Sequence, residues 1–261
     1  MSSQNLNDIL KNKTLGSSEI VRLLNDYFYS IRNNIPEIRK NIKKVKSSLT
    51  QFQGVDTYLK ELGYVLRKNN KTELKSFLSE HTNKELKKFE ILFSKVYPFL
   101  KDFESVITIS RSGTVLEILK LWYKKNKRIE VIVCESRPMF EGRLLAIDLV
   151  KEGIKVKLIT DAMMGLYINE VDAAIIGADD VLKNGNIINK VGSKALALLS
   201  RDQKKPVYVL SSKSKFSNQK YYRLKSENPN EVWNKKSKKL SIQNIYFEEI
   251  EKKLITKVVT D

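Results

Sequence analysis

Short apolar runs rich in valine and isoleucine recur along the second half of the chain, and their spacing restricts the fold more than any other feature. The runs lie about 20–30 residues apart and cover residues 106–109, 131–134, 156–159, 173–176 and 206–210. Helical patterns of apolar residues fill the intervals between them. Strands that alternate with helices in this way predict a doubly wound, Rossmann-like α/β fold with a parallel sheet. One interruption, Asn184-Gly185 between two apolar pairs, predicts a β-hairpin.

The first hundred residues contain no such runs and instead place apolar residues at helical intervals. The clearest pattern consists of Ile20, Leu23, Leu24, Tyr27, Phe28 and Ile31. Comparable patterns start again after Pro36 and continue to Leu100. This periodicity predicts amphipathic helices. Because the pattern changes at Ser105, we expect a helical N-terminal domain over 1–104 and a Rossmann-like domain over 105–261.

The composition is typical of a folded protein inside the cell. Hydrophobic residues make up 41% of the chain and charged residues 30%, which argues against a disordered polypeptide. No apolar run approaches the ~18 residues of a membrane helix, and no secretory signal is visible. The single cysteine, Cys134, excludes an internal disulfide and a cysteine-rich metal site. We therefore expect a cytoplasmic protein without a membrane span, a metal or a cofactor, since nucleotide-binding glycine motifs are also absent.

The net charge of +18 raises the question of a nucleic-acid partner. The excess is concentrated in 211–239, where nine Lys and Arg residues accompany only Glu227 and Glu231. Tyr221, Tyr222 and Trp233 lie in the same stretch, so it is suited to bind RNA or an acidic protein. The simpler interpretation is a set of solvated lysines that serves solubility.

The loops that follow the predicted strands are the expected position of a ligand site. In an open parallel sheet, ligands bind beyond the carboxyl ends of the strands. Hydroxyl, carboxylate and cationic side chains gather there, in residues 110–114, 135–138, 160–161, 177–180 and 211–213. The first of these loops opens a helix, whose free N–H groups and dipole favour a phosphate. Ordinary capping and ion pairing explain any one loop, but five loops at one sheet edge favour a pocket without requiring catalysis.

Three motifs resemble one protein family in their order and spacing. They are Glu135-Ser-Arg-Pro-Met-Phe-Glu-Gly-Arg143, Gly177-Ala-Asp179 with Asn184-Gly185, and Asn189-Lys-Val-Gly192. The family comprises the alpha, beta and delta regulatory subunits of translation initiation factor 2B. Its superfamily also includes ribose-1,5-bisphosphate isomerase and methylthioribose-1-phosphate isomerase. The resemblance covers roughly residues 105–250, whereas the first hundred residues agree only in being helical.

The resemblance implies a homo-oligomer, a dimer or larger, that assembles through the α/β half and has translation initiation factor 2 as its partner. It also implies a pocket for a phosphorylated metabolite or nucleotide. The expected ligand-binding residues are Ser110, Arg111, Ser112, Glu135, Arg137, Gly142, Arg143, Asp179, Asn189, Lys190 and Lys213.

Whether such a chain is an enzyme depends on a few positions, because the superfamily contains isomerases and inert regulators. The isomerases carry a cysteine after the first strand of this domain, which works with the acid of the Gly-Ala-Asp motif. Ser110 and Asp179 occupy those positions here. A thiol can be tuned to shuttle a proton at neutral pH, whereas an unassisted serine hydroxyl cannot.

Two phosphate-binding segments of the isomerases are also missing. Leu15-Gly-Ser-Ser18 stands where they have Arg-Gly-Ala, and nothing between Ser47 and Tyr64 resembles their Arg-Pro-Thr segment. We therefore expect a non-catalytic regulatory subunit. The alternative is a sugar-phosphate isomerase with an altered site, in which Asp179 acts as general acid and base.

Overall fold

The N-terminal part of the chain is helical, as predicted. The computed structural model describes residues 5–12, 14–49 and 52–261. In this part the chain before the sheet forms helices α1 (Leu6–Lys11), α2 (Ser17–Ser30), α3 (Ile35–Ser48), α4 (Gln53–Arg67) and α5 (Lys71–Leu100). The side chains of Asn5, Asn34 and Asn70 cap α1, α3 and α5 by accepting hydrogen bonds from N–H groups of the first turn.

A six-stranded parallel sheet forms the second part, in the order β3-β2-β1-β4-β7-β9. Its strands are β1 (Ser105–Ile109), β2 (Glu130–Cys134), β3 (Lys155–Ile159), β4 (Ala173–Gly177), β7 (Val207–Ser211) and β9 (Lys257–Thr260). The first five were predicted from the apolar runs, and the Rossmann-like α/β fold class is confirmed. The predicted hairpin is confirmed as well, because β5 (Asp180–Val181) pairs antiparallel with β6 (Ile187–Lys190), which also pairs with β8 (Phe247–Ile250).

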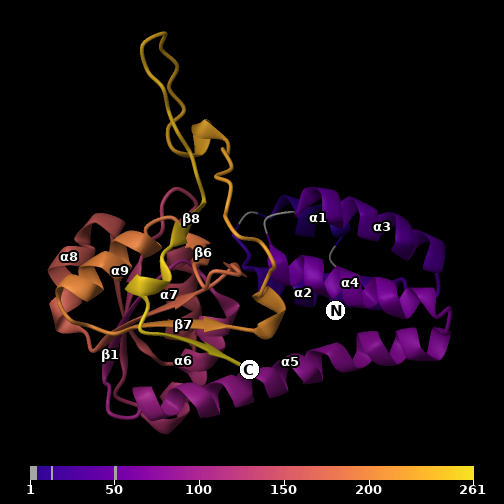
Figure 1. The fold of residues 1–261 in the computed structure, drawn as a ribbon, viewed down its shortest axis with the longest axis horizontal. Helices are drawn as coiled ribbons and strands as arrows, with labels where there is room; N and C mark the ends of the chain where they lie inside the picture. Colours follow the sequence, from indigo (N-terminus) through magenta and orange to yellow (C-terminus); the bar gives the residue numbers. More distant parts are fainter. Residues whose placement is uncertain (1–4, 13, 50–51) are drawn as a thin grey trace.

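Helices cover both faces of the sheet (Figure 1). One face packs against α6 (Gly113–Lys125), α7 (Glu141–Lys151) and the C-terminal half of α5, with Trp122 fully buried at 0% exposure. The other face packs against α8 (Met164–Tyr167), α9 (Ser193–Asp202) and the small sheet. Short 3-10 turns occur at Asp161–Met163, Ile168–Glu170, Lys213–Lys215, Pro229–Glu231 and Lys252–Leu254.

Helix α5 connects the two parts of the molecule. Its N-terminal residues Leu74 and Leu78 belong to the core of the helical region, whereas Leu92, Val96 and Leu100 belong to a core on the sheet. A helix that contributes to both cores holds the helical region against the sheet, and Figure 1 shows α5 running beneath both parts.

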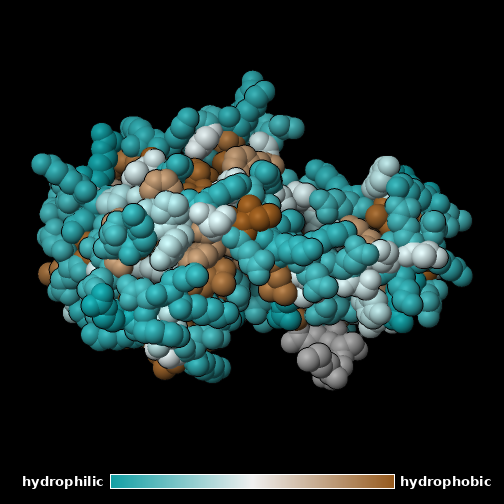
Figure 2. Space-filling model, turned by 90° about the horizontal axis from the view of Figure 1, so that it is seen from below, coloured by the Kyte–Doolittle hydropathy of each residue, from teal (hydrophilic) through white to brown (hydrophobic). Residues whose placement is uncertain are grey.

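The surface is largely hydrophilic. Figure 2 shows the face seen from below, where brown hydrophobic areas are scattered among teal hydrophilic ones. No helix in the described ranges is long and apolar enough to cross a bilayer.

Residues 228–244, here called the arm, form a long segment that projects away from the rest of the fold in Figure 1. Asn244 closes the arm at its base, because its Nδ2 donates to the carbonyl oxygen of Asn228 at 2.7 Å.

Candidate functional site

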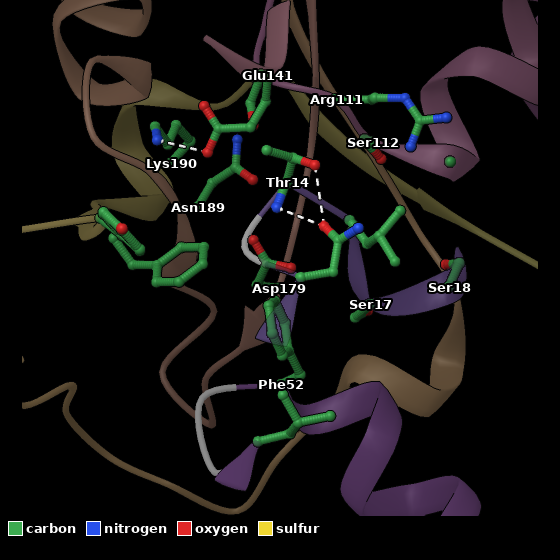
Figure 3. A pocket seen from close by; sticks show the side chains of 18 of the residues that line it. Thr14, Ser17, Ser18, Phe52, Arg111, Ser112, Glu141, Asp179, Asn189 and Lys190 are labelled. Atoms are coloured by element: carbon green, nitrogen blue, oxygen red, sulfur yellow. Dashed lines mark hydrogen bonds and ion pairs between the residues drawn. The ribbon is translucent and has the colours of Figure 1, made fainter. Parts of the chain in front are cut away.

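A cavity of about 220 Å³ lies where the strand order of the sheet reverses. Strands β1 and β4 are neighbours at this point, and the strands that follow them lie on opposite sides of the pair. A ligand crevice usually lies at such a point of a parallel sheet. The cavity is lined from the sheet by residues 110–113, 178–179 and 189–190, and from the helical region by 14–18, Leu49 and Phe52. Figure 3 shows these two groups facing each other across the pocket.

Two helix N-termini reach this cavity. Helix α2 begins at Ser17 after Gly16, which supplies no side-chain cap, and α6 begins after Ser112, whose Oγ accepts the Val115 N–H at 3.4 Å. A Cβ atom on Gly16 would lie 2.9 Å from the backbone oxygen of Arg111, so glycine permits the close approach of the two termini. The Ser17 side chain is buried, and its Oγ has no hydrogen-bond partner in the described part of the chain. Free N–H groups, aligned dipoles and this unused hydroxyl favour an anion.

Charged side chains occupy the deeper wall of the cavity. Lys190 Nζ lies 2.7 Å from Glu141 Oε1, and the Lys190 residue is only 1% exposed. The second carboxylate oxygen of Glu141 is buried without a partner among the described residues. Lys215 is buried as well, and its Nζ donates to the carbonyl oxygen of Ala178 at 2.6 Å. The wall therefore offers both cationic groups and a free carboxylate acceptor.

Asp179 and Lys215 influence each other's protonation. Burial raises the pKa of the Asp179 carboxyl, and the positive charges of Lys215 and Lys190 offset part of this effect. Burial lowers the pKa of Lys215, and Asp179 opposes that change. No described residue forms a hydrogen bond with the Asp179 carboxyl, so this group is available to a ligand hydroxyl in the cavity.

Arg111 lines the cavity, but its charge is already neutralised. The guanidinium forms an ion pair with Glu19 and a second one with Asp148, at 2.8 Å. Figure 3 shows the guanidinium directed away from Glu141 and Lys190. What Arg111 can offer a ligand is therefore its backbone, next to the start of α6, rather than an unpaired positive charge.

The structure brings six of the predicted residues together and leaves five outside the cavity. The lining includes Ser110, Arg111, Ser112, Asp179, Asn189 and Lys190; the residues outside it are Glu135, Arg137, Gly142, Arg143 and Lys213. Arg143 pairs with Glu135 at 2.6 Å, and Arg137 donates to the Val232 carbonyl oxygen at 2.9 Å. The backbone N–H of Lys213 donates to Asp261 at 2.8 Å. These contacts hold loops together at the rim of the sheet.

Several lining residues were not predicted, and they come from distant segments. They include Thr14, Ser17, Phe52, Glu141, Lys215, Glu227 and Tyr246. Glu141 lies inside the motif over residues 135–143, so the sequence contains a local signal for it. Tyr246 has no local signal: its ring lies 5.0 Å from Lys190 Nζ, and its hydroxyl hydrogen-bonds to Glu231 at the base of the arm.

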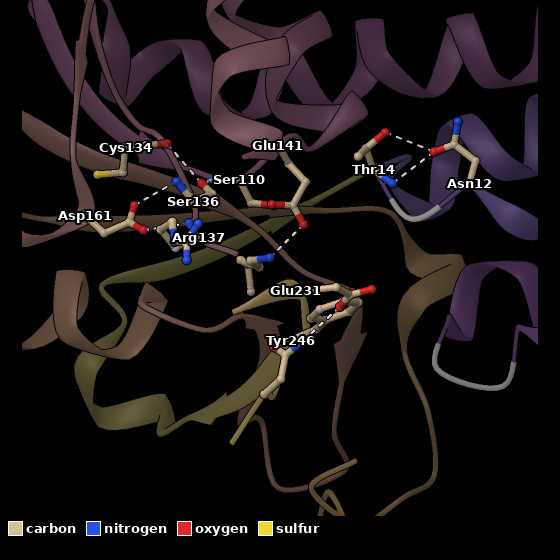
Figure 4. Close-up of polar contacts among 12 residues, drawn as sticks. Asn12, Thr14, Ser110, Cys134, Ser136, Arg137, Glu141, Asp161, Glu231 and Tyr246 are labelled. Carbon is tan, nitrogen blue, oxygen red and sulfur yellow. Dashed lines mark hydrogen bonds and ion pairs between the residues drawn. The ribbon is translucent and has the colours of Figure 1, made fainter. Parts of the chain in front are cut away.

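Ser110 adopts an unusual backbone conformation that neighbouring loops hold in place (Figure 4). Its φ angle is 68°, in the left-handed region, and its N–H donates to Ser136 Oγ at 2.7 Å. The Ser136 N–H in turn donates to Asp161 at 2.8 Å. Within the described ranges no carboxylate or imidazole is hydrogen-bonded to the Ser110 hydroxyl, and His81 lines two other hollows of the surface. The described residues therefore provide no base in hydrogen-bond contact with this hydroxyl.

Cys134 does not replace the absent thiol. It is fully buried at the end of β2, and it does not line the cavity. Burial, together with the negative charge of Asp161, raises the pKa of the thiol to about 12. A thiol with this pKa stays protonated at neutral pH, and only the thiolate is an effective nucleophile or proton acceptor. The described residues also contain no cluster of acidic, His or Cys side chains suited to a metal ion.

Comparison with known proteins connects this geometry to one family. The family model described as the initiation factor 2 subunit family matches residues 5–261. A translation initiation factor eIF-2B subunit 2-like protein of Pyrococcus horikoshii is 34% identical over 186 residues, which is 71% of this chain and 65% of the relative. The ribose 1,5-bisphosphate isomerase of Archaeoglobus fulgidus is 39% identical over 118 residues, 45% of this chain and 38% of the enzyme. The chain thus spans less than two thirds of the length of both relatives.

Solved structures agree with the fold over nearly the whole chain. The translation initiation factor eIF-2B of Pyrococcus horikoshii superposes with a TM-score of 0.83 at 26% identity, covering 97% of this chain and 92% of that chain. The 5-methylthioribose 1-phosphate isomerase of the same organism gives a TM-score of 0.81 at 18% identity, covering 98% and 81%. The second likeness concerns the fold alone, so it does not distinguish an isomerase from a regulator.

Proposed function

Because this chain belongs to the initiation factor 2 subunit family, we propose that it is a non-catalytic, regulatory subunit of the translation initiation factor 2B type. One observation carries the proposal: Ser110 lines the cavity at the position where the resemblance implies a cysteine in the isomerases, and no carboxylate or imidazole in the described ranges is hydrogen-bonded to its hydroxyl. The single thiol of the chain is buried and protonated, with a pKa of about 12. The cavity therefore lacks the thiol that would carry a proton between sugar carbons at neutral pH.

The cavity remains suited to a phosphorylated sugar or nucleotide. The N-termini of α2 and α6 favour a phosphate, and Ser17 Oγ offers it an additional donor. Glu141 and Asp179 have carboxylate oxygens that can accept hydrogen bonds from sugar hydroxyls. A ligand held in this way links the helical region to the sheet, since its contacts come from both.

We expect a phosphorylated sugar such as ribose 1,5-bisphosphate to raise the melting temperature, whereas free ribose does not. A ligand at a hundred times its Kd stabilises the folded state by about 2.7 kcal/mol, which corresponds to roughly 5–10 °C for a chain of this size. Ser17→Ala should leave the melting temperature of the free protein nearly unchanged and weaken the ligand about tenfold or more, because a hydrogen bond to a charged group is lost.

Ser47→Ala, at an exposed serine of α3, is the matched control and should bind like the wild type. No thermal shift with sugar phosphates or nucleotides, or equal shifts in the wild type and Ser17→Ala, would show that the cavity is not the phosphate site. The same samples are examined by NMR for conversion of ribose 1,5-bisphosphate, and we expect none at an enzyme-like rate.

The second candidate is an isomerase with an altered site. The observation in its favour is the raised pKa of Asp179, since a carboxyl that holds its proton closer to neutral pH can serve as general acid and base. Turnover that Asp179→Asn abolishes without loss of ligand binding would establish this function in place of the regulatory one. Binding without turnover supports the regulatory function.

We also propose that the protein acts in the cytoplasm as a homo-oligomer that contacts translation initiation factor 2. The outer edge of the sheet supports assembly with a second copy, because Ile147, Val150 and Leu158 on α7 and β3 are 47–59% exposed.

Light scattering should give at least twice the chain mass of 30.2 kDa at micromolar concentration. Ile147→Lys with Val150→Lys should yield monomers. A wild-type monomer at every concentration would contradict the assembly, and no mass increase with added initiation factor 2 would contradict the partner.

A further inference from the structure

The arm concentrates positive charge that no other described part of the protein neutralises. Lys235, Lys236, Lys238 and Lys239 are all exposed, and none has a carboxylate within 4.0 Å among the described residues. The sequence contains no acidic residue from 232 to 247. Glu231, the single acid of the arm, hydrogen-bonds to Asn244 at 2.9 Å and to the hydroxyl of Tyr246 at the base. The lysines therefore repel one another unless an external anion is bound.

The base of the arm is held firmly although its tip extends from the protein. Ser226 and Ile245 form an antiparallel bridge just below it, and the N–H of Glu227 donates to the carbonyl oxygen of Asn244 at 2.8 Å. The guanidinium of Arg137 donates to the Val232 carbonyl oxygen at 2.9 Å from the neighbouring loop. Figure 1 shows that the tip points away from both the sheet and the helical region. The lysines are thus carried on a segment whose base is anchored to the protein.

Exposed aromatic rings accompany this charge. Trp233 in the arm is 59% exposed, and Tyr221, which precedes the arm, is 61% exposed. A flat indole beside lysines matches a base beside phosphates, whereas an acidic protein surface offers carboxylates without a stacking partner. We propose that the arm binds single-stranded nucleic acid, with phosphates at the four lysines and a base stacked on Trp233.

The test measures the affinity of the 261-residue chain for fluorescent oligo-uridylate at several salt concentrations. Four phosphate contacts give a slope of about −3 in log K against log salt, which is about a 50-fold loss between 50 and 200 mM salt. Changing Lys235, Lys236, Lys238 and Lys239 together to Gln should remove most of this slope and most of the affinity. Trp233→Ala should weaken binding about tenfold, and Trp233→Phe should retain most of the affinity because it keeps a stacking ring.

A charge-matched control separates the arm from the overall basic character of the protein. Lys40, Lys43, Lys71 and Lys75 are exposed on α3 and α5 and have no ion pair in the described ranges, so their joint change to Gln removes the same charge elsewhere. We expect this control to bind nearly as well as the wild type. Equal losses in both quadruple variants, a flat salt response, or unchanged affinity in Trp233→Ala would overturn the proposal. Stronger competition by polyglutamate than by unlabelled RNA would assign the arm to an acidic protein instead.

Discussion

Gly142→Ala is expected to destabilise the folded chain by at least about 3 kcal/mol. A Cβ atom at this position would lie 1.8 Å from the backbone oxygen of Cys134 and 2.9 Å from its carbonyl carbon. Both atoms belong to the backbone at the buried end of β2, so a rotamer change cannot relieve the contact. Helix α7 must move away from the sheet, and Glu141 at its first position moves with it.

Chemical denaturation of the purified variant measures this loss, and Gly63→Ala supplies the control. A Cβ atom on Gly63, inside helix α4, would meet nothing within 4 Å. Alanine there should stabilise the protein by about 0.5–1 kcal/mol, because glycine has the greater conformational freedom to lose in a helix. The same substitution thus has opposite signs at two helical glycines. Similar free energies of unfolding for the two variants would mean that the close approach of α7 to β2 is not required.

The sheet was predictable from the sequence because its central strands are buried on both faces. A strand such as 173–176, with no polar residue, has no other stable environment in a protein of this composition. Strand β9, over Lys257–Thr260, was not predicted, because at the edge of the sheet its lysine remains exposed and the run resembles an ordinary C-terminal segment. Helix α5 (Lys71–Leu100) continues past Pro98, which lies in its last turn and does not end it, as the apolar pattern up to Leu100 indicated.

The candidate site was predictable where a loop or short motif contains its own signal, as at 110–112, Asp179 and 189–190. Residues 110–112 open a helix after a strand, and that local pattern was enough to place them at the cavity. The Arg111 guanidinium forms an ion pair with Glu19, which lies 92 residues away in the sequence. No local pattern reveals this contact. Arg137 and Arg143 follow the next strand and have the residue types of an anion site, yet Val232 and Glu135 engage them at the rim. The sequence shows which residues have side chains suited to an anion. Tertiary contacts decide whether each of these side chains points into the cavity or away from it.

The buried pair of Lys190 and Glu141 gives the second large effect. Lys190→Met should cost about 3–5 kcal/mol, because it leaves the Glu141 carboxylate buried without its cation. Glu141→Met should cost a similar amount by leaving Lys190 unpaired. The double variant, with two apolar side chains of similar length, should recover most of the loss, since neither charge then remains buried. Denaturation of the wild type and all three variants completes the cycle; losses that simply add in the double variant would show that the pair does not act as a unit.

The pH dependence of Lys190→Met provides an independent check. Burial already raises the pKa of Glu141 in the wild type, and Lys190 offsets part of that rise, so the variant has a still higher folded-state pKa. Below the unfolded-state pKa the carboxyl is protonated in both states and its ionisation costs nothing. As the pH rises above that value, the carboxyl ionises in the unfolded chain before it ionises in the folded chain. The free energy of unfolding therefore falls until the pH passes the folded-state pKa. Above the pKa of the carboxyl in the unfolded chain, stability should therefore fall more steeply with rising pH in Lys190→Met than in the wild type, and the double variant should lose this difference. Parallel pH profiles for all proteins would place the Glu141 carboxylate in contact with solvent rather than in the buried wall of the cavity.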